Sequence, residues 1–516
     1  MRRLALLPPL LSLLAACTVG PDYKGPPDVA PRSEAAGQFH RAASAPVDVA
    51  TPPARWWDGM GWDGRGDPEL AHLVDLALAA SPTLKAAQAR VLEARALVAQ
   101  QRAALFPQGN ATALAAKARI PTGALSTADN QINAALAREA ITNPSLFPGG
   151  TPPHVDIPNH VTTELYNLGF DARWELDLFG GTRREIEAAA AQTDAAAAKV
   201  EDAQVQLAAE VGQAYVGLRD AQHRLDLTRA SAAAEHRMLD LTVDKRRLGT
   251  ATDADVARME TQARQTDAQI PPLEGQVEQA MDQLALLAGQ EPGTLDAELA
   301  PIRPLPLPPA VVPVADPAAL LRRRPDIRAA ERQLAASNAE IGYAVAQLFP
   351  NVSLFGSIGF GSNKVDTLFR SSSLSMIGAP MLSWNVLDWG RVRAQIRQAS
   401  AANEESLAQY QSTVLQALQD AESGLSRYGH QREATFQLAA ALDVATRAQR
   451  LADARYRGGT ATALEALDAE RQRLLVEQSL AQAQAQTSND YIALQKSLGL
   501  GWQPVDPARL PNPPDY

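Results

Sequence analysis

The sequence predicts an α+β membrane protein built from a duplicated set of strands and very long helices. Three observations lead to this prediction. One segment alternates between apolar and polar residues with period two, two helical segments run on without a proline, and several motifs occur twice at a fixed spacing. No window of about 20 residues is continuously apolar, so a transmembrane helix is not expected.

The clearest strand pattern lies at about 164–176. Residues on one face are mostly polar, charged or small, and residues on the other face are apolar. The apolar face consists of Tyr166, Leu168, Phe170, Ala172, Trp174 and Leu176. A strand that crosses an outer membrane needs about 9–11 residues with this alternation, because one face meets lipid and the other meets water. The alternative interpretation is a half-buried edge strand of a soluble domain.

The N-terminus has the features of a bacterial lipoprotein signal. Arg2 and Arg3 precede an apolar stretch that ends in Leu14-Ala15-Ala16-Cys17, a sequence typical of a lipobox. We expect residues 1–16 to be removed and Cys17 to carry a covalent lipid rather than to be an inert core thiol. This lipid is the only non-protein group that we predict. Because Cys17 is the single cysteine, no intramolecular disulfide can form.

The mature chain then divides into five parts. Residues 17–66, rich in proline and small residues and containing Trp56, Trp57 and Trp62, should form an extended arm on the surface of the fold. A helix should begin at Pro68 with Asp67 as its cap and break at Ser81-Pro82. The remaining parts are a first repeat at 67–290, a proline-rich semi-rigid connector at 291–317, a second repeat at 318–500 and a tail at 501–516.

The two repeats follow from motifs that recur at two spacings. At 243 residues, Ser81-Pro82 and Leu105-Phe106-Pro107 recur as Arg324-Pro325 and Leu348-Phe349-Pro350. At 210 residues, Phe179-Gly180, Gly249-Thr250-Ala251-Thr252 and Gly289 recur as Trp389-Gly390, Gly459-Thr460-Ala461-Thr462 and Gly499. Each repeat should therefore contain a helix, two strands, a long helix, a turn and a helix. The change in spacing gives the first repeat the longer strand–strand loop, at about 120–160, which we expect to be solvent-exposed.

Four strands per chain are expected, at about 109–118, 164–176, 351–361 and 374–386. Their aromatic residues Tyr166, Phe170, Trp174 and Trp384 are interpreted as facing the membrane, with packing against the helices as the alternative. Four strands cannot close on themselves, and an open edge in lipid leaves backbone groups without partners. If the strands meet lipid, several copies must form one barrel whose strand number is a multiple of four.

The long helices are expected at 182–248 and 391–457, each about 100 Å long if unbroken. Both carry apolar residues at alternating spacings of four and three, as in a coiled coil. The expected seams are Leu207, Val211, Ala214, Leu218, Ala221 and Leu225 in the first helix, and Leu407, Gln411, Val414, Leu418, Ala421, Leu425 and Tyr428 in the second. Helices of this length fit an extended tube better than a globular core.

Other classes of function are disfavoured. The net charge of −10 argues against a nucleic-acid surface. No phosphate loop or nucleophile elbow is present, and the histidines show no paired metal-ligand spacing beyond His154, Asp156 and His160. Arg323-Arg324-Pro325-Asp326 is interpreted as a helix start rather than a phosphate site. We therefore predict no enzyme activity.

Three motifs, together with the duplication, resemble those of the TolC/NodT lipoprotein family of outer-membrane factors, the exit ducts of tripartite efflux pumps. They are Cys17-Thr18-Val19-Gly20-Pro21-Asp22-Tyr23, Gly169-Phe170-Asp171-Ala172 with Trp174-Glu175-Leu176-Asp177-Leu178-Phe179-Gly180, and Arg323-Arg324-Pro325-Asp326-Ile327 with Ala330-Glu331. The resemblance covers nearly the whole mature chain. It implies a homotrimer whose twelve strands form an outer-membrane β-barrel, continued by a periplasmic α-helical barrel.

The resemblance also implies roles at the periplasmic tip. Asp255, Glu465 and Asp468 would form carboxylate rings that narrow the pore, the alternative being solvated positions on helix faces. Where some members carry a basic residue that locks this constriction, the chain has Ala461. Pro271-Pro272, absent from the second repeat, should break a helix of the first. A periplasmic adaptor would dock at Gly249, Thr250, Tyr456, Gly459 and Thr460.

The implied function is a passive outer-membrane exit duct, lipid-anchored and membrane-spanning, that exports small molecules such as drugs or toxic compounds. It would work with a periplasmic adaptor and an inner-membrane transporter of the RND type. One alternative is the outer-membrane channel of a type I protein-secretion system. Another, from a different class, is a coiled-coil periplasmic scaffold or adaptor lipoprotein.

Overall fold

The computed structural model describes residues 18–62, 66–121, 123–143, 151–152 and 160–504. The predicted signal peptide, Cys17, much of the loop at 144–159 and the end of the tail lie outside these residues. The chain divides into two compact units. The strand unit combines segments 1–20, 99–186 and 342–396, and the helical unit combines segments 21–98, 187–341 and 397–516.

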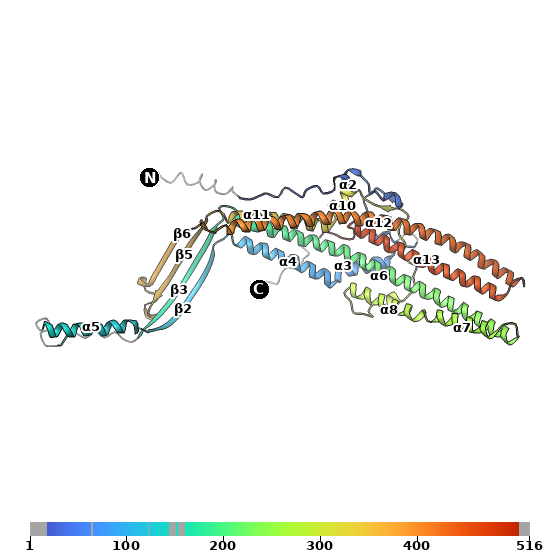
Figure 1. Ribbon diagram of the computed structural model, residues 1–516, viewed down its shortest axis with the longest axis horizontal. Helices are drawn as coiled ribbons and strands as arrows, with labels where there is room; N and C mark the ends of the chain where they lie inside the picture. The colour runs from blue at the N-terminus through green and yellow to red at the C-terminus, as the bar shows by residue number, and fades with distance from the viewer. Residues whose placement is uncertain (1–17, 63–65, 122, 144–150, 153–159, 505–516) are drawn as a thin grey trace. The chain divides into compact units, whose positions relative to one another are not determined.

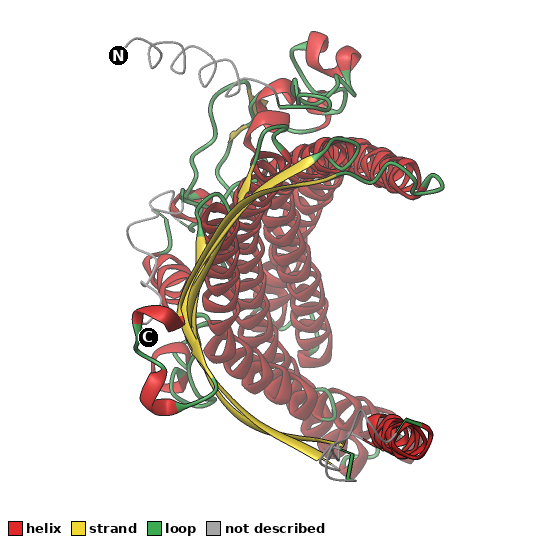
Figure 2. Ribbon diagram, turned by 90° about the vertical axis from the view of Figure 1, so that its left-hand side faces the viewer, coloured by secondary structure: helices red, strands yellow, loops and turns green. Residues whose placement is uncertain are grey.

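An antiparallel sheet of four strands forms the strand unit, in the order β2-β3-β5-β6 (Figure 1). The strands are β2 (Gln108–Pro121), β3 (His160–Leu176), β5 (Asn351–Ser362) and β6 (Leu374–Ser383). Figure 2 shows that the sheet is curved. The inner pair β3 and β5 joins the first repeat to the second, so β2 and β6 are the edges.

One strand is shorter than predicted. Trp384 and Val386 were expected in the last strand, but β6 ends at Ser383. Beyond it the N–H of Val386 donates to the carbonyl of Trp384, and the carboxylate of Asp388 accepts from the N–H groups of Gly390 and Val392. The chain leaves the sheet because these residues form the turn that starts the next helix.

The predicted loop at 120–160 contains a helix that the sequence interpretation missed. Helix α5 (Gly123–Thr142) follows β2 and extends beyond the ends of the strands in Figure 1. Its sequence holds no proline between Pro121 and Pro144, and it is rich in alanine, the residue with the highest helix propensity. The prediction of a loop without a helix gave too much weight to the flanking Pro, Gly and Asn residues.

The helices repeat as the duplication predicts. The first repeat has α3 (Pro68–Ala80), α4 (Pro82–Ala103), α6 (Gly181–Arg247), α7 (Asp253–Asp267) and α8 (Ile270–Leu287), and the second has α10 (Pro317–Arg323), α11 (Pro325–Ala346), α12 (Arg391–Arg457) and α13 (Ala463–Ser497). Helices α6 and α12 each contain 67 residues. The predicted break is present, since α7 and α8 are separated just before Pro271-Pro272 whereas α13 is continuous.

The core of the helical unit is built on α6 and α12, with the first seam as predicted. All six expected residues of α6, from Leu207 to Leu225, are buried. The seam of α12 differs, because Gln411 is exposed and Leu407 only partly buried. Tyr410 and Ala417 are buried instead. The predicted seam of α12 is therefore wrong at Gln411. A polar side chain stays in water unless it finds a buried partner.

Most of the predicted arm lies on the surface as expected, but its tryptophan segment is part of the core. The 3-10 helix η2 (Trp56–Gly59) buries both Trp56 and Trp57, and the Trp56 ring lies edge-on to Tyr491 of α13 with centroids 6.3 Å apart. Of the three tryptophans of the arm, Trp62 alone is exposed. Burial of two indole rings removes a large apolar surface from water, so this short segment packs inside while the rest of the arm stays outside.

The connector also carries more structure than expected. It contains the short helix α9 (Asp296–Leu299) and the strand β4 (Val312–Pro313), which pairs in parallel with β1 (Val47–Asp48) of the arm. Proline is tolerated here because β1 and β4 form a sheet of only two strands, where the proline nitrogen has no second neighbour to bond.

A buried ionic cluster ties α3, α6 and the connector together. The guanidinium of Arg219, fully buried on α6, bonds the carboxylate of Glu69 and donates to the carbonyls of Leu299 (3.2 Å) and Pro301 (2.8 Å). The hydroxyl of Tyr215 donates to the same carboxylate at 2.9 Å, and burial raises the pKa of Tyr215. The partly exposed Arg303 also places its Nε 3.4 Å from this carboxylate. Because Glu69 and Arg219 are both buried, most of the charge compensation comes from this pair.

Arg219→Met should lower the free energy of unfolding of the helical unit by about 3–5 kcal/mol, because the buried Glu69 carboxylate would keep only the partly exposed Arg303 as a cation. Denaturant unfolding in detergent, followed by circular dichroism, measures the change. The double variant Arg219→Met/Glu69→Leu should recover most of the loss, since it leaves no buried charge behind. A double variant that loses as much as the single one would contradict this role.

Candidate functional site

The register of the sheet places most of the large apolar residues of the four strands on one face. Phe170 pairs with Ala111 on one side and Ile358 on the other, and Ile358 pairs with Met376. Residues directly opposite each other in neighbouring strands share a face. The same face carries the rows Ala113, Leu168, Phe360, Leu374 and Leu176, Val352, Leu382.

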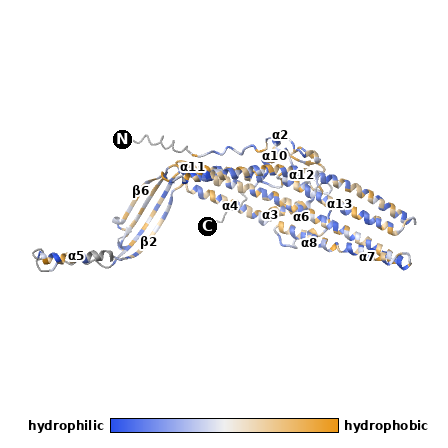
Figure 3. Ribbon diagram, viewed as in Figure 1, coloured by the Kyte–Doolittle hydropathy of each residue, from blue (hydrophilic) through white to orange (hydrophobic). Residues whose placement is uncertain are grey.

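This apolar face is open to its surroundings in the chain. Phe170, Ile358, Met376 and Leu382 are among the exposed large apolar side chains. An exposed apolar surface of this extent marks contact with a membrane or with another protein. The strands alternate between apolar and polar residues along their length (Figure 3).

The opposite face is polar along β3. Asn167, Asp171, Arg173 and Glu175 lie there, and Asp171 is opposite Ser357. Glu175 accepts a hydrogen bond from the amide of Asn351 at 2.5 Å. The edge strand β6 alternates less cleanly and brings Ile377 and Met381 to this face. The face is therefore suited to water chiefly in the middle of the sheet.

The four aromatic residues predicted to face the membrane differ in position. Tyr166 and Trp174 lie at opposite ends of the apolar stretch of β3, and Phe170 lies midway. Tyr166 and Trp174 are eight residue steps apart, about 26 Å of strand, close to the apolar band of about 25 Å in outer-membrane barrels. The indole N–H groups of Trp174 and Trp384 donate to the carbonyls of Leu105 (2.8 Å) and Leu348 (3.0 Å). The two indoles thus tie the segments that follow α4 and α11 to the sheet.

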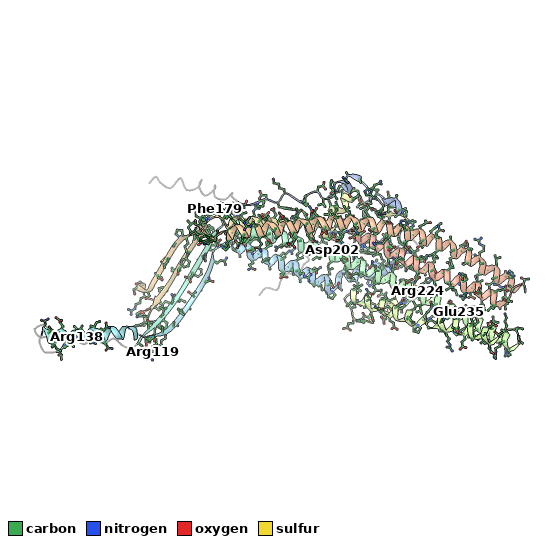
Figure 4. The ribbon with its side chains drawn as sticks, in the orientation of Figure 1. Arg119, Arg138, Phe179, Asp202, Arg224 and Glu235 are labelled. Carbon is green, nitrogen blue, oxygen red and sulfur yellow. The ribbon has the colours of Figure 1, made fainter. Side chains whose placement is uncertain are left out.

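Residues next to the predicted lipidation site are docked in the strand unit. The N–H of Val19 donates to the carbonyl of Phe179 at 3.1 Å, and Nε of Arg184 donates to the carbonyl of Val19 at 3.2 Å. Gly20 approaches Gly342 so closely that a Cβ on Gly20 would lie 2.4 Å from the Gly342 Cα atom. Figure 4 labels Phe179 at the end of the sheet where α6 begins. The chain therefore leaves this dock toward residue 17 at the helix end of the sheet.

The two Gly-Thr turns have the same hydrogen bonds. After α6, Gly249 N–H donates to Arg246 O (2.9 Å) and Thr250 N–H to Lys245 O (2.8 Å). After α12, the equivalent bonds join Gly459 to Tyr456 and Thr460 to Arg455, both at 2.9 Å. This pair of bonds is the Schellman motif, and it requires the left-handed backbone that Gly249 (φ 71°) and Gly459 (φ 74°) adopt.

Each turn is followed by a threonine that caps the next helix. Thr252 accepts from the N–H of Asp255, and Thr462 accepts from the N–H of Glu465, both at 3.2 Å. Asp255 in turn accepts from the backbone N–H and hydroxyl of Thr252, which holds the pKa of Asp255 below its usual range. Asp255 is therefore charged at neutral pH, and its carboxylate is part of a capping box with Thr252.

The other predicted tip residues are more exposed. Glu465 and Asp468 are exposed on the first turns of α13, and Asp468 accepts a hydrogen bond from Arg471 at 3.0 Å. Tyr456 is 49% exposed beside the second turn. The carboxylates thus stay available to solvent, with Asp468 partly neutralised by its neighbour.

The His, Cys, Asp and Glu side chains of the described residues are not grouped as metal ligands would be. No group of three or more His, Cys, Asp or Glu residues is placed there to hold a metal ion. His160 contacts Arg119 (3.2 Å), while His154 and Asp156 lie outside the described part of the chain. None of the described helices combines the length and the apolar composition needed to cross a membrane.

Comparisons with known proteins agree with this architecture. Residues 73–290 and 317–500 match the Outer membrane efflux protein family. The outer-membrane channel OprN superimposes with a TM-score of 0.78 at 36% identity, over 95% of this chain and all of OprN. Outer membrane protein OprJ of Pseudomonas aeruginosa is 31% identical over 95% of this chain and 94% of its own. The solvent efflux pump outer membrane protein SrpC of Pseudomonas putida is 30% identical over 95% and 97%.

Gly459→Val should disrupt the second turn, because a left-handed backbone costs a residue with a Cβ about 1–2 kcal/mol. Hydrogen exchange at the amide of Thr460 should then accelerate by about 5–30-fold. Gly458→Ala is the matched control, since Gly458 does not have a positive φ and its nearest contact to an added Cβ would be 3.3 Å. Equal exchange rates in the two variants would show that the turn does not depend on Gly459.

Proposed function

Because the chain belongs to the outer membrane efflux protein family, we propose that it is the outer-membrane exit duct of a tripartite efflux pump. The observation that supports this proposal most is a four-stranded sheet with one apolar face, one polar face and two open edges. Two helices of 67 residues follow directly from it in the chain. Such a sheet can separate lipid from water, and such helices can extend a channel away from the membrane.

The duct is a homotrimer in this proposal. Backbone groups on an open strand edge cannot remain unpaired in hydrocarbon, so β2 and β6 must find partners on other copies. Three copies supply twelve strands, enough to leave a lumen wider than that of an eight-stranded barrel, whose interior is filled by side chains. The long helices of the three copies would continue the wall on the periplasmic side.

The cargo in this proposal is small and the duct is passive. SrpC is named for solvent efflux, which supports small, poorly soluble molecules as cargo. The relatives are channels and efflux components by name, and we assign no reaction to this chain. Energy would come from an inner-membrane transporter of the RND type, coupled through a periplasmic adaptor.

The Gly-Thr turns are the proposed contact for that adaptor. Gly249, Thr250, Gly459 and Thr460 give both turns the same backbone shape, so one adaptor element can engage either turn. Tyr456, half-exposed beside the second turn, adds an aromatic side chain with a hydroxyl. The first turn has Arg246 at the equivalent place, which distinguishes the two contacts.

Glu465 and Asp468 are the proposed constriction, with Asp255 contributing charge from its capping box. Three copies of these carboxylates around one axis would repel one another and favour cations. Ala461 supplies no positive charge to lock such a ring.

Glu465→Ala/Asp468→Ala should raise single-channel conductance in planar bilayers and lower cation selectivity, because the carboxylate ring that narrows the pore is removed. Glu477→Ala on the same helix, whose carboxylate accepts from Arg473 within α13, is the matched control and should behave as wild type. Conductance and selectivity that do not change in the double variant would refute the constriction. A protein that forms no channel in any variant would refute the duct.

Cys17 is the proposed lipid anchor, and the dock of Val19 and Gly20 supports it by fixing the chain two residues away. Cys17→Ser should abolish labelling by radioactive palmitate. The variant should still resist extraction by carbonate, since the sheet holds it in the membrane independently of the lipid. Continued labelling would exclude this anchor, and release by carbonate would exclude the membrane-spanning sheet.

A further inference from the structure

Two aromatic side chains at the helix end of the sheet lack the packing that their counterparts have. Trp389, between β6 and α12, is 98% exposed, and Phe106, just before β2, is 66% exposed. Trp389 is also the one non-glycine residue with a positive φ (53°) in the described part of the chain. A bulky side chain on a left-handed backbone is unusual, and here no contact within the chain accounts for it.

The counterparts of these residues pack against each other inside the chain. Trp389 corresponds to Phe179 at the 210-residue spacing, and Phe106 corresponds to Phe349 at the 243-residue spacing. The rings of Phe179 and Phe349 are stacked, with centroids 4.7 Å apart and planes 18° apart. This stack closes the seam between the two repeats, where β3 meets β5.

The same spacings relate other contacts of the sheet. The indole of Trp174 bonds the carbonyl of Leu105, and the indole of Trp384 bonds the carbonyl of Leu348, so the hydrogen bond within one repeat is reproduced in the other. Contacts in three dimensions therefore follow the duplication. The contact between the two repeats at β3 and β5 should therefore have a counterpart that involves the other two strands, β2 and β6.

We propose that this counterpart is a contact between two copies of the chain. Trp389 of one copy stacks on Phe106 of its neighbour, as Phe179 stacks on Phe349. One chain cannot make this contact by itself, because the two residues flank opposite edge strands and three strand spacings, about 14 Å, separate β2 from β6. The occupant of each site is therefore a second copy of this chain. The inference rests on the proposed oligomeric duct and specifies how its copies join.

The proposal also fixes the register of the joined edges. Across the internal seam Leu176 pairs with Val352 and Phe170 with Ile358. Shifted by the two spacings, these pairs become Val386 with Gly109 and Pro380 with Ala115 of the neighbour. In the same register Leu374, the first residue of β6, meets Pro121, the last residue of β2. The two edge strands therefore coincide at this end without overhang.

The faces of the two edges agree in this register. Leu382, which pairs with Val352 on the apolar face, would lie opposite Ala113, which pairs with Leu168 on the same face. A slip of one residue would bring apolar side chains of one copy beside polar side chains of the next. The register derived from the duplication is thus also the one that keeps the apolar face continuous.

Cysteine cross-linking of the full-length protein in detergent tests the contact. The chain carries Phe106→Cys and Trp389→Cys together, and a short bis-maleimide is added. Products of two and three chains should appear, about tenfold more abundant than with Phe106→Cys and Phe369→Cys, because neighbouring thiols have a high effective concentration. Phe369 is a matched control, being an exposed aromatic residue in the loop between β5 and β6.

Two further samples make the outcome decisive. Phe179→Cys/Phe349→Cys should cross-link within one chain, giving a single-chain product that carries one linker joined to both thiols, which establishes that the sheet is folded. Differently tagged chains with Phe106→Cys alone and Trp389→Cys alone, expressed together, should cross-link to each other and neither to itself. An intact trimer by light scattering that gives no such product would overturn this contact and leave the proposed duct standing. A protein that is monomeric throughout would overturn both.

Discussion

Backbone hydrogen bonding at the two sheet edges is the constraint on which the rest of the structure depends. Each of β2 and β6 pairs on one side only, and an N–H or C=O group without a partner costs several kcal/mol in hydrocarbon. The curved sheet of one chain is therefore a segment of a closed wall. In the proposed assembly the exposed apolar side chains of that segment need no burial within the chain, because lipid covers the face and neighbouring copies cover the edges.

The helical unit meets a different constraint, since its surroundings are water. The apolar seams of its long helices are buried in one core together with Trp56 and residues of α13, and many of the seam residues are alanine, which allows close approach. The cluster of Glu69, Tyr215 and Arg219 adds polar contacts of defined direction to this otherwise non-directional packing. One helix such as α6 thus begins beside a sheet suited to lipid and continues in a coiled core suited to water, with no change in its backbone geometry.

Sequence patterns predicted the elements with a strict period and missed those fixed by tertiary contacts. The alternation of β3, the proline-free helices and the recurring Gly-Thr turns each follow from local rules, and the structure contains all of them. The burial of Trp56 and Trp57 could not be predicted, because it depends on Tyr491, far away in the sequence. The end of β6 was misplaced because Trp384 and Val386 continue the alternation although Asp388 already caps the next helix. The assignment of Asp255 to the tip came from the family resemblance alone. Its capping bond could have been predicted from the sequence, because Thr252 and Asp255 have the spacing of a capping box.

The contacts of the N-terminal arm have a consequence for the order of folding. Its partners come late in the chain: Val312 for Val47, Glu422 for the backbone of His40, and Tyr491 for Trp56. The arm leaves the ribosome first, yet it cannot complete its packing until the last helix has been made. Contacts between such distant residues form slowly, because a long loop must close before they contribute. The indole rings of Trp56 and Trp57 therefore cannot complete their packing until α13 has been made.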